Sequence, residues 1–451
     1  MNININNKGI KLKDVMDSPC GLRYMFDTLD LCSGYSRKLL LNSDIMTDSR
    51  DVINYYSSLE EIYTKYCSIG PKRKIELLKN KFCNLKDILG TINRLSSNNI
   101  LDDIELFEIK SLALLTNDVR TILLNDEIQS VKLPDLDDVI SVLDPDGFKI
   151  CSFYVYDSYS EELRNLRIRI KQSNNSSEKQ ELELQEKDLE CKVRKDICAK
   201  LILHTKELYD SLMTLGQLDV LIAKAQQIAS MHLIFPLISE NDYTSYRGLF
   251  HPQIKVNKEF IPIDIDFDNR PVIITGSNMG GKTVTLMMCA LSQYLFQFGF
   301  GIPAEYASIA IKEKIYLIMG DGQNIYGGYS SFAAEMISIN SIIQGAKRGE
   351  KLIAIIDEPA RTTNPIEGRA LVQGLLDTLY KYHIFVLVST HYNINEGEYK
   401  WLRVKGFVDG KMDYRLIEAK RGEVPHEAVK IAKNLGVCEE WLELSEQYIN
   451  N

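Results

Sequence analysis

Apolar and polar residues follow two different patterns along this chain. Up to about residue 233, apolar side chains recur every three or four positions, as in the series Val52, Tyr55, Leu59, Ile62 and Tyr66, which lines one face of a helix. From about residue 234, short apolar runs alternate with helical patterns, which is typical of buried parallel strands joined by helices. These runs are Val272–Ile274, Ile315–Met319, Leu352–Ile356 and Phe385–Val388. The sequence therefore predicts an all-α part, residues 22–233, followed by an α/β part, residues 234–451, with a mainly parallel sheet. Residues 1–21 are polar and are expected to form a lead-in.

Residues 157–213 contain no Gly or Pro and are dense in Glu, Lys, Arg and Leu. A polar break, Gln172–Ser177, separates two amphipathic halves, so this stretch predicts a helical hairpin that projects as an arm. Between Asp157 and Lys200, ten basic residues balance ten acidic ones. An arm that grips phosphates usually has a basic excess, so contact with a partner protein and contact with nucleic acid both stay open. The run Cys151–Tyr156 before the arm predicts a short strand.

A phosphate-binding loop follows the first apolar run. It has the pattern G-x-x-x-x-G-K-T between a predicted strand and a predicted helix, which is the context in which such a loop binds a nucleoside triphosphate. Glycines let consecutive N–H groups turn toward phosphate oxygens, while the lysine adds a charge and the threonine a Mg²⁺ ligand. The candidate ATP-binding residues are Gly276, Ser277, Asn278, Met279, Gly280, Gly281, Lys282 and Thr283.

Two further strand ends carry candidate catalytic groups. The apolar run from Leu352 ends in Asp357, placed to hold Mg²⁺, and Glu358, placed to orient or deprotonate an attacking water. The run from Phe385 ends at His391, for which a γ-phosphate contact is favoured over a purely structural role. Gly327–Met336 adds a glycine-rich turn and serines before another helix, a second helix end that can receive an anion. One of the two helix ends is therefore expected to complete the site of a neighbouring subunit.

Charge and cysteine content narrow the class of protein. The net charge of −9 does not indicate general nucleic-acid binding, although a local basic face is compatible with it. The nine cysteines are scattered without a C-x-x-C pair, as in a reduced, cytoplasmic protein. The first residues have no signal-peptide core and no run reaches about eighteen apolar residues, so we expect no membrane association.

The motifs together resemble those of the MutS family of ABC-type ATPases. Gly276–Thr283 is similar to that family's Gly-Pro-Asn-Met-Gly-Gly-Lys-Ser, Ser330–Met336 to its Ser-Thr-Phe-x-x-Glu-Met, and Ser389–Tyr392 to its Ala-Thr-His-Tyr. Residues 101–110 resemble the family's helical lever, and Phe250–Pro252 a loop that leads into the ATPase. The likeness covers residues 22 to 445. It implies an α/β ABC-type P-loop ATPase domain, an all-α lever domain with a helical-hairpin clamp, and dimerisation as a homodimer or with a MutS-like paralogue. It further implies that Ser330 reaches the γ-phosphate across the dimer, that Asn278 assists the phosphates, and that His426 approaches the base.

Several departures from the family pattern shape the expected function. The family's Asp-Glu-x-Gly-x-Gly-Thr becomes Asp357–Thr363 with neither glycine, and Asn364–Gly368 resembles the second, non-mismatch branch of the family. The mismatch-reading N-terminal domains and that branch's C-terminal nuclease domain are not expected here. Short MutS-related proteins of this shape accompany bacterial lysine and ornithine aminomutases, where they are thought to reactivate the cobalamin enzyme.

Two functions follow as expectations. In the first, ATP binding and hydrolysis with Mg²⁺ drive dimer and clamp movement on DNA, as in mismatch repair but without mismatch reading. In the second, the ATPase is a chaperone-like factor that reactivates a cobalamin-dependent aminomutase, which the acidic charge and balanced arm favour. A degenerate, purely structural ATPase is disfavoured because Lys282, Thr283, Asp357, Glu358 and His391 are all present.

Overall fold

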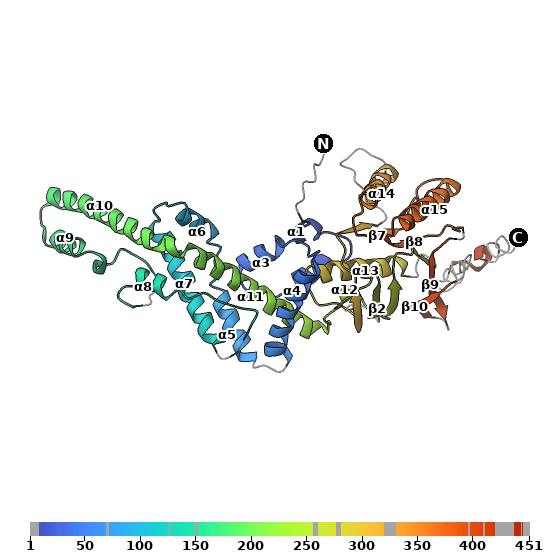
Figure 1. Ribbon diagram of the computed structural model, residues 1–451, viewed down its shortest axis with the longest axis horizontal. Helices are drawn as coiled ribbons and strands as arrows, with labels where there is room; N and C mark the ends of the chain where they lie inside the picture. The colour runs from blue at the N-terminus through green and yellow to red at the C-terminus, as the bar shows by residue number, and fades with distance from the viewer. Residues whose placement is uncertain are drawn as a thin grey trace. The chain divides into compact units, whose positions relative to one another are not determined.

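The computed structural model of this chain describes residues 9–68, 72–124, 126, 128–148, 152–255, 260–276, 281–319, 331–395, 397–408, 411–419, 437–442 and 444. The chain divides into two compact units. The α/β unit comprises Met1–Leu29, Ser43–Tyr56 and Gln227–Asn451, and the helical unit comprises Asp30–Asn42 and Ser57–Gln226. Two of the passages of the chain between the units lie within continuous helices, α4 (Ser49–Ile62) and α11 (Thr205–Met231) (Figure 1).

A six-stranded sheet forms the centre of the α/β unit, with the order β10-β9-β4-β8-β7-β6. All neighbouring strands are parallel except the edge pair β9 and β10. The four predicted apolar runs are confirmed as strands of this sheet, since strands buried on both faces read as continuous apolar sequence. The strands are β4 (Val272–Thr275), β6 (Lys314–Ile318), β7 (Leu352–Asp357), β8 (Phe385–Ser389), β9 (Lys400–Val408) and β10 (Lys411–Glu418).

Helices cover both faces of this sheet (Figure 1). On one face, α14 (Ser331–Lys347) and α15 (Pro365–Lys381) pack with Leu352, Ala354 and Ile356 of β7 in one buried cluster. The alternate residues of β7 point to the other face, where α13 (Lys282–Gln297) packs on β6, β7 and β8. Nearly every residue of α13 is buried, so the helix that follows the phosphate loop is a central part of the core.

A second, four-stranded sheet has the order β1-β5-β2-β3. The sequence pattern did not predict it, because its strands are short and carry polar residues between the apolar ones, as in Thr244-Ser-Tyr-Arg. The strands are β1 (Leu237–Ile238), β2 (Thr244–Leu249), β3 (Ile263–Phe267) and β5 (Tyr306–Ile309). The unit also contains α1 (Leu12–Val15), α2 (Leu22–Asp27) and α12 (Pro252–Lys255). Leu12, Met16 and Cys20 are buried, so the described part of the expected lead-in packs into the α/β unit.

The helical unit is built around α7 (Asp103–Leu123), which begins at a capping box formed by Asp102 and Glu105. Lys110 of α7 is fully buried and is paired with Asp144 at 3.1 Å and with the Tyr156 hydroxyl at 3.1 Å.

The strand predicted at 151–156 was wrong for the described residues 152–156, which have no regular structure. Tyr156 is buried there through its ring contacts and its bond to Lys110. The remaining helices are α3 (Gly34–Leu41), α5 (Lys72–Phe82), α6 (Leu89–Ser96) and α8 (Asp137–Leu143), with a π-turn at Tyr63–Ser68.

The predicted break after Gln172 separates α9 (Glu161–Gln172) from α10 (Ser176–Leu201), which lie side by side (Figure 1). The side chain of Ser160 accepts a hydrogen bond from the first turn of α9, and that of Asn175 from the first turn of α10. Arg167 ties the two helices together, since its guanidinium donates to Asp157, Glu186 and Glu190. A short 3₁₀ turn, Ile202–His204, leads from α10 into α11. None of the described helices has the length and apolar character needed to cross a membrane.

Candidate functional site

The phosphate-loop sequence links β4 to α13. Gly276 follows β4 directly, and Gly281 is the N-cap of α13, with the intervening residues Ser277, Asn278, Met279 and Gly280 outside the described part. Gly281 has φ +80°, and a Cβ there would lie 2.9 Å from the ring of Tyr414 on β10. A glycine is therefore required both by the backbone angle and by the close approach of the ring. The first N–H groups of α13 have no intrahelical acceptor, and this makes the helix end a place for an anion.

Lys282 lies at the start of α13 with its side chain only 3% exposed. Its Nζ donates to the carbonyl oxygen of Gly276 at 2.8 Å and lies 3.7 Å from Oε1 of Glu358. Burial lowers the pKa of Lys282, and the neighbouring carboxylates of Glu358 and Asp357 oppose this shift. A buried ammonium group next to a helix N-terminus gives the loop a concentrated positive charge.

Asp357 is the last residue of β7, and both of its carboxylate oxygens are held. Oδ2 accepts from the Thr283 hydroxyl at 2.7 Å, and Oδ1 accepts from the Ser389 hydroxyl. Ser389 ends β8 and lies opposite Asp357 in the parallel register of the sheet. Ser389 belongs to the Ser389–Tyr392 motif, but no role is predicted for it from the sequence. Its position two residues before His391, at the end of a strand parallel to β7, is the signal that could have identified it.

Glu358 follows Asp357, and its carboxylate is surrounded by positive or polar groups. Its Oε1 lies 2.5 Å from Nε2 of His391, and its Oε2 accepts from Arg361 at 3.2 Å. Burial by itself would raise the pKa of Glu358, but the charges and hydrogen bonds of His391, Arg361 and Lys282 outweigh it and lower the pKa. The carboxylate is therefore ionised at neutral pH, as a base that accepts a proton from water must be.

Five of the predicted site residues, Lys282, Thr283, Asp357, Glu358 and His391, thus come together at the carboxyl ends of β4, β7 and β8. In open α/β sheets, ligands bind at the carboxyl ends of the strands. The adjacent oxygens of Thr283 and Asp357 also fit Mg²⁺, which prefers oxygen ligands and takes its remaining ligands from water and substrate phosphates. The predicted residues Ser330 and His426 lie outside the described part of the chain.

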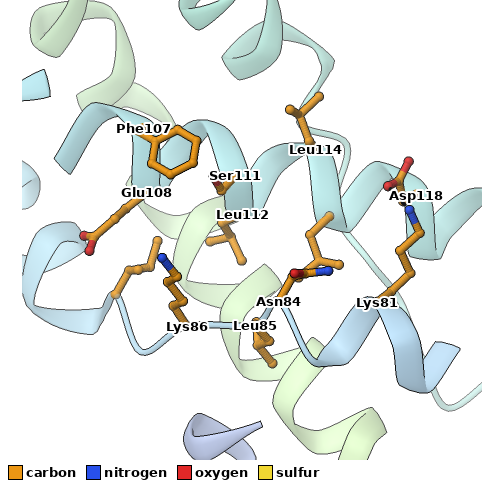
Figure 2. A pocket seen from close by; sticks show the side chains of 12 residues that line it. Lys81, Asn84, Leu85, Lys86, Phe107, Glu108, Ser111, Leu112, Leu114 and Asp118 are labelled. Carbon is orange, nitrogen blue, oxygen red and sulfur yellow. Dashed lines mark hydrogen bonds and ion pairs between the residues drawn. The ribbon is translucent and has the colours of Figure 1, made fainter. Parts of the chain in front are cut away.

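A separate pocket of about 340 Å³ lies in the helical unit beside α7 (Figure 2). Figure 2 shows Lys81 close to Asp118, and their side chains form an ion pair of 2.6 Å. Glu108 on the same helix as Asp118 accepts a hydrogen bond from Thr91 at 2.5 Å. With Lys86, the lining carries two basic and two acidic side chains, so it has no charge excess for a phosphate.

The close approach of Tyr414 to Gly281 gives a stability prediction. We expect Gly281→Ala to lower the free energy of unfolding of the α/β unit by about 2–4 kcal/mol, as strain and clash add. Gly349→Ala is the matched control, because Gly349 has φ +78° with nothing within 4 Å of its Cβ position, so it should cost only about 1–2 kcal/mol. Urea unfolding measures both, followed by the fluorescence of the two tryptophans, Trp401 and Trp441, which both belong to the α/β unit. Equal costs for the two variants would contradict a clash with Tyr414.

The sequence of this chain is similar to a known protein family and to several known proteins. Residues 272–407 match the family model of MutS domain V. The chain is 31% identical over 280 residues to "Endonuclease MutS2" of Carboxydothermus hydrogenoformans, which is 59% of this chain and 35% of that protein. It is 30% identical over 288 residues to the protein of the same name from Caldanaerobacter subterraneus subsp. tengcongensis, which is 61% of this chain and 35% of that protein. A third, from Lachnospira eligens, is 34% identical over 216 residues.

The chain thus spans about a third of the length of the first two of these relatives. The matched region 272–407 begins at β4 and ends within β9, so it contains the phosphate loop, both acidic residues and His391. The side chains gathered at one edge of the sheet therefore all come from the segment that the family shares. The chain thus carries a MutS domain V at residues 272–407, and this domain makes it similar to proteins of the MutS family.

Proposed function

We propose that this chain is an ATPase of the MutS type, which binds ATP with Mg²⁺ at the edge of the six-stranded sheet and hydrolyses it. The observation that carries the proposal is the convergence of Lys282, Thr283 and Asp357 with the Glu358–His391 pair. A buried lysine, a hydroxyl–carboxylate pair and an ionised carboxylate at one strand edge are the groups that phosphoryl transfer to water requires.

In the proposed reaction, Lys282 and the N–H groups at the start of α13 hold the phosphates. Glu358 accepts a proton from the water whose oxygen attacks the γ-phosphorus, while the bond to the β–γ bridging oxygen breaks and ADP leaves. His391, hydrogen-bonded to Glu358, orients its carboxylate and contacts the γ-phosphate. When Mg²⁺ is bound by Thr283 and Asp357, it neutralises the charge on the phosphate oxygens.

The dimer is part of the proposal. By resemblance to the family, Ser330 of one subunit reaches the γ-phosphate of the other, and Asn278 and His426 contact the phosphates and the base. ATP binding would then favour the dimer, and hydrolysis would release it. We propose that this cycle moves the helical unit as a lever, with the α9–α10 hairpin as a clamp on DNA.

A second candidate is a chaperone-like reactivating factor for a cobalamin-dependent aminomutase. The observation that favours it is the charge of the hairpin. Arg167 is fully occupied with three carboxylates, and Arg194 is paired with Asp103 at 3.4 Å and with Glu190 at 3.4 Å. Basic side chains engaged in this way are less available to neutralise phosphates, so a protein client suits the hairpin at least as well as DNA.

Replacing the phosphate-loop lysine tests nucleotide binding. We expect Lys282→Ala to weaken ATP binding by about 10- to 100-fold, because a charge-assisted contact to phosphate is lost. Lys314→Ala is the control, since Lys314 begins β6 at the opposite edge of the sheet and is paired with Glu350. Titration with a fluorescent ATP analogue measures both, and undiminished affinity in Lys282→Ala would refute the binding assignment.

Replacing the proposed base tests hydrolysis. We expect Glu358→Gln to bind ATP but to hydrolyse it about 10²- to 10⁴-fold more slowly, and to accumulate as a dimer with ATP. Steady-state phosphate release and light scattering measure the two effects. Glu350→Gln, which removes a carboxylate paired with Lys314 and Arg348, should keep the normal rate. An unchanged rate in Glu358→Gln would remove Glu358 from the role of base.

A DNA-binding experiment distinguishes the two candidate functions. It measures binding to duplex and branched DNA across a salt series, with and without ATP. A DNA clamp should bind in an ATP-dependent manner, with the logarithm of the binding constant falling steeply with the logarithm of salt concentration. Replacing the exposed Lys179 or Lys187 of the hairpin by Ala should then reduce the slope by about one each. The absence of binding at moderate salt, in a preparation that hydrolyses ATP, would overturn the DNA clamp and direct the search to protein clients.

A further inference from the structure

The turn that follows β7 has an unusual backbone. Glu358 has φ +48° and Ala360 has φ +58°, so two residues with side chains adopt the left-handed conformation on either side of Pro359. Each such residue costs about 1–2 kcal/mol relative to the right-handed conformation. This cost concerns function directly, because the backbone angles of Glu358 determine where its carboxylate points. The turn must therefore be held by other groups.

Packing and hydrogen bonds both contribute to holding it. Pro359 and Ala360 line one side of a groove of about 430 Å³ between α14 and α15, together with Met336 and Ile343 of α14 and Leu375 of α15. Ala360 is nevertheless only 1% exposed and belongs to the buried cluster on this face of the sheet, so packing contributes to holding the strained backbone. Packing is not directional, so hydrogen bonds to the turn are what set the orientation of its peptide groups.

Three side chains supply these hydrogen bonds. The amide of Glu358 donates to the Ser389 hydroxyl at 2.9 Å, and the amide of Ala360 donates to Oε1 of Glu335 at 3.0 Å. The hydroxyl of Tyr392 donates to the carbonyl oxygen of Ala360 at 2.8 Å. Ser389 ends β8 and Tyr392 follows it closely in sequence. Glu335 lies instead in the second turn of α14.

Tyr392 reaches the turn only because of a glycine. A Cβ at Gly368 of α15 would lie 2.3 Å from the Tyr392 hydroxyl. The hydroxyl is thus seated between α15 and the turn, and it fixes the carbonyl side of Ala360. Glu335 fixes the amide side of the same residue. Because Glu335 is half-buried, burial raises the pKa of its carboxyl group, and the Ala360 amide partly opposes this shift.

We propose that Glu335 is a positioning residue for hydrolysis, which holds the turn at 358–360 in the left-handed conformation that directs the Glu358 carboxylate toward Lys282 and His391. The inference rests on the proposed ATPase function. Glu335 belongs to the Ser330–Met336 motif, for which the resemblance to the family implies a role only for Ser330. The acceptor oxygen of Glu335 is the feature that matters, because the bond at Ala360 requires an acceptor and not a charge.

The test compares Glu335→Ala with Glu335→Gln in the full chain. Gln keeps an acceptor oxygen, so its kcat should stay within about twofold of the parent, whereas Ala should lower kcat by about tenfold or more. The KM for ATP should change by less than about twofold in both variants, because the hydrogen bond of Glu335 is to Ala360, outside the residues proposed to hold the phosphates. Equal losses in Ala and Gln, unchanged kcat in Ala, or a rise in KM matching the fall in kcat would each overturn the proposal.

A second pair of variants separates positioning from general destabilisation. Ala360→Gly removes the strain of the left-handed conformation, so it should restore part of the kcat lost in Glu335→Ala. Thr362→Gly is the matched control, because Thr362 is absent from the described residues with positive φ and should give no rescue. Rescue by Thr362→Gly equal to that by Ala360→Gly would contradict the inference. If the parent chain binds but does not hydrolyse ATP, the proposed function fails. If the parent hydrolyses ATP and Glu335→Ala does so with the same kcat, only this inference fails.

Discussion

The hydrogen bond from Thr283 to Asp357 joins the first turn of α13 to the end of β7. It connects the two segments that supply the positive and the negative groups of the site. Lys282 and Thr283 come from the helix, and Asp357 and Glu358 come from the strand. Because both segments are largely buried, this bond holds the groups of the helix and the strand in one arrangement.

The central sheet and its candidate site were predictable because their signals are local. The phosphate loop is one continuous stretch, and β7 reads as an apolar run that ends in Asp357 and Glu358. The rest depends on residues distant in sequence. Ser389 bonds to Asp357 only because β7 and β8 are adjacent and in register, and Glu335 reaches Ala360 only because α14 packs over the sheet. Neither pairing leaves a periodic pattern in the sequence.

The errors also have physical reasons. Residues 152–156 have the composition of a strand, but they belong to a unit whose described elements are helical and provide no strand to pair with. Their aromatic side chains are accommodated as a ring cluster around Tyr156 instead. The loss of the family's glycines suggested an altered loop after Glu358. Ala360 nevertheless adopts a glycine-like φ, which means that the backbone shape can persist when the residue type does not.

The burial of α13 has a mechanical consequence. Its last turn is fixed by the amide of Gln297, which donates to the carbonyl oxygens of Met46 and Lys312, and the Tyr56 hydroxyl lies 3.0 Å from the carbonyl oxygen of Phe296. A helix enclosed in this way moves as one rigid rod, because bending it would break several buried hydrogen bonds. Met46 precedes α4 and Tyr56 lies within it, at the last residue before the chain enters the helical unit. A displacement of the N-terminus of α13, such as phosphate binding would cause under the proposed function, would therefore be transmitted along the whole helix to Met46 and Tyr56.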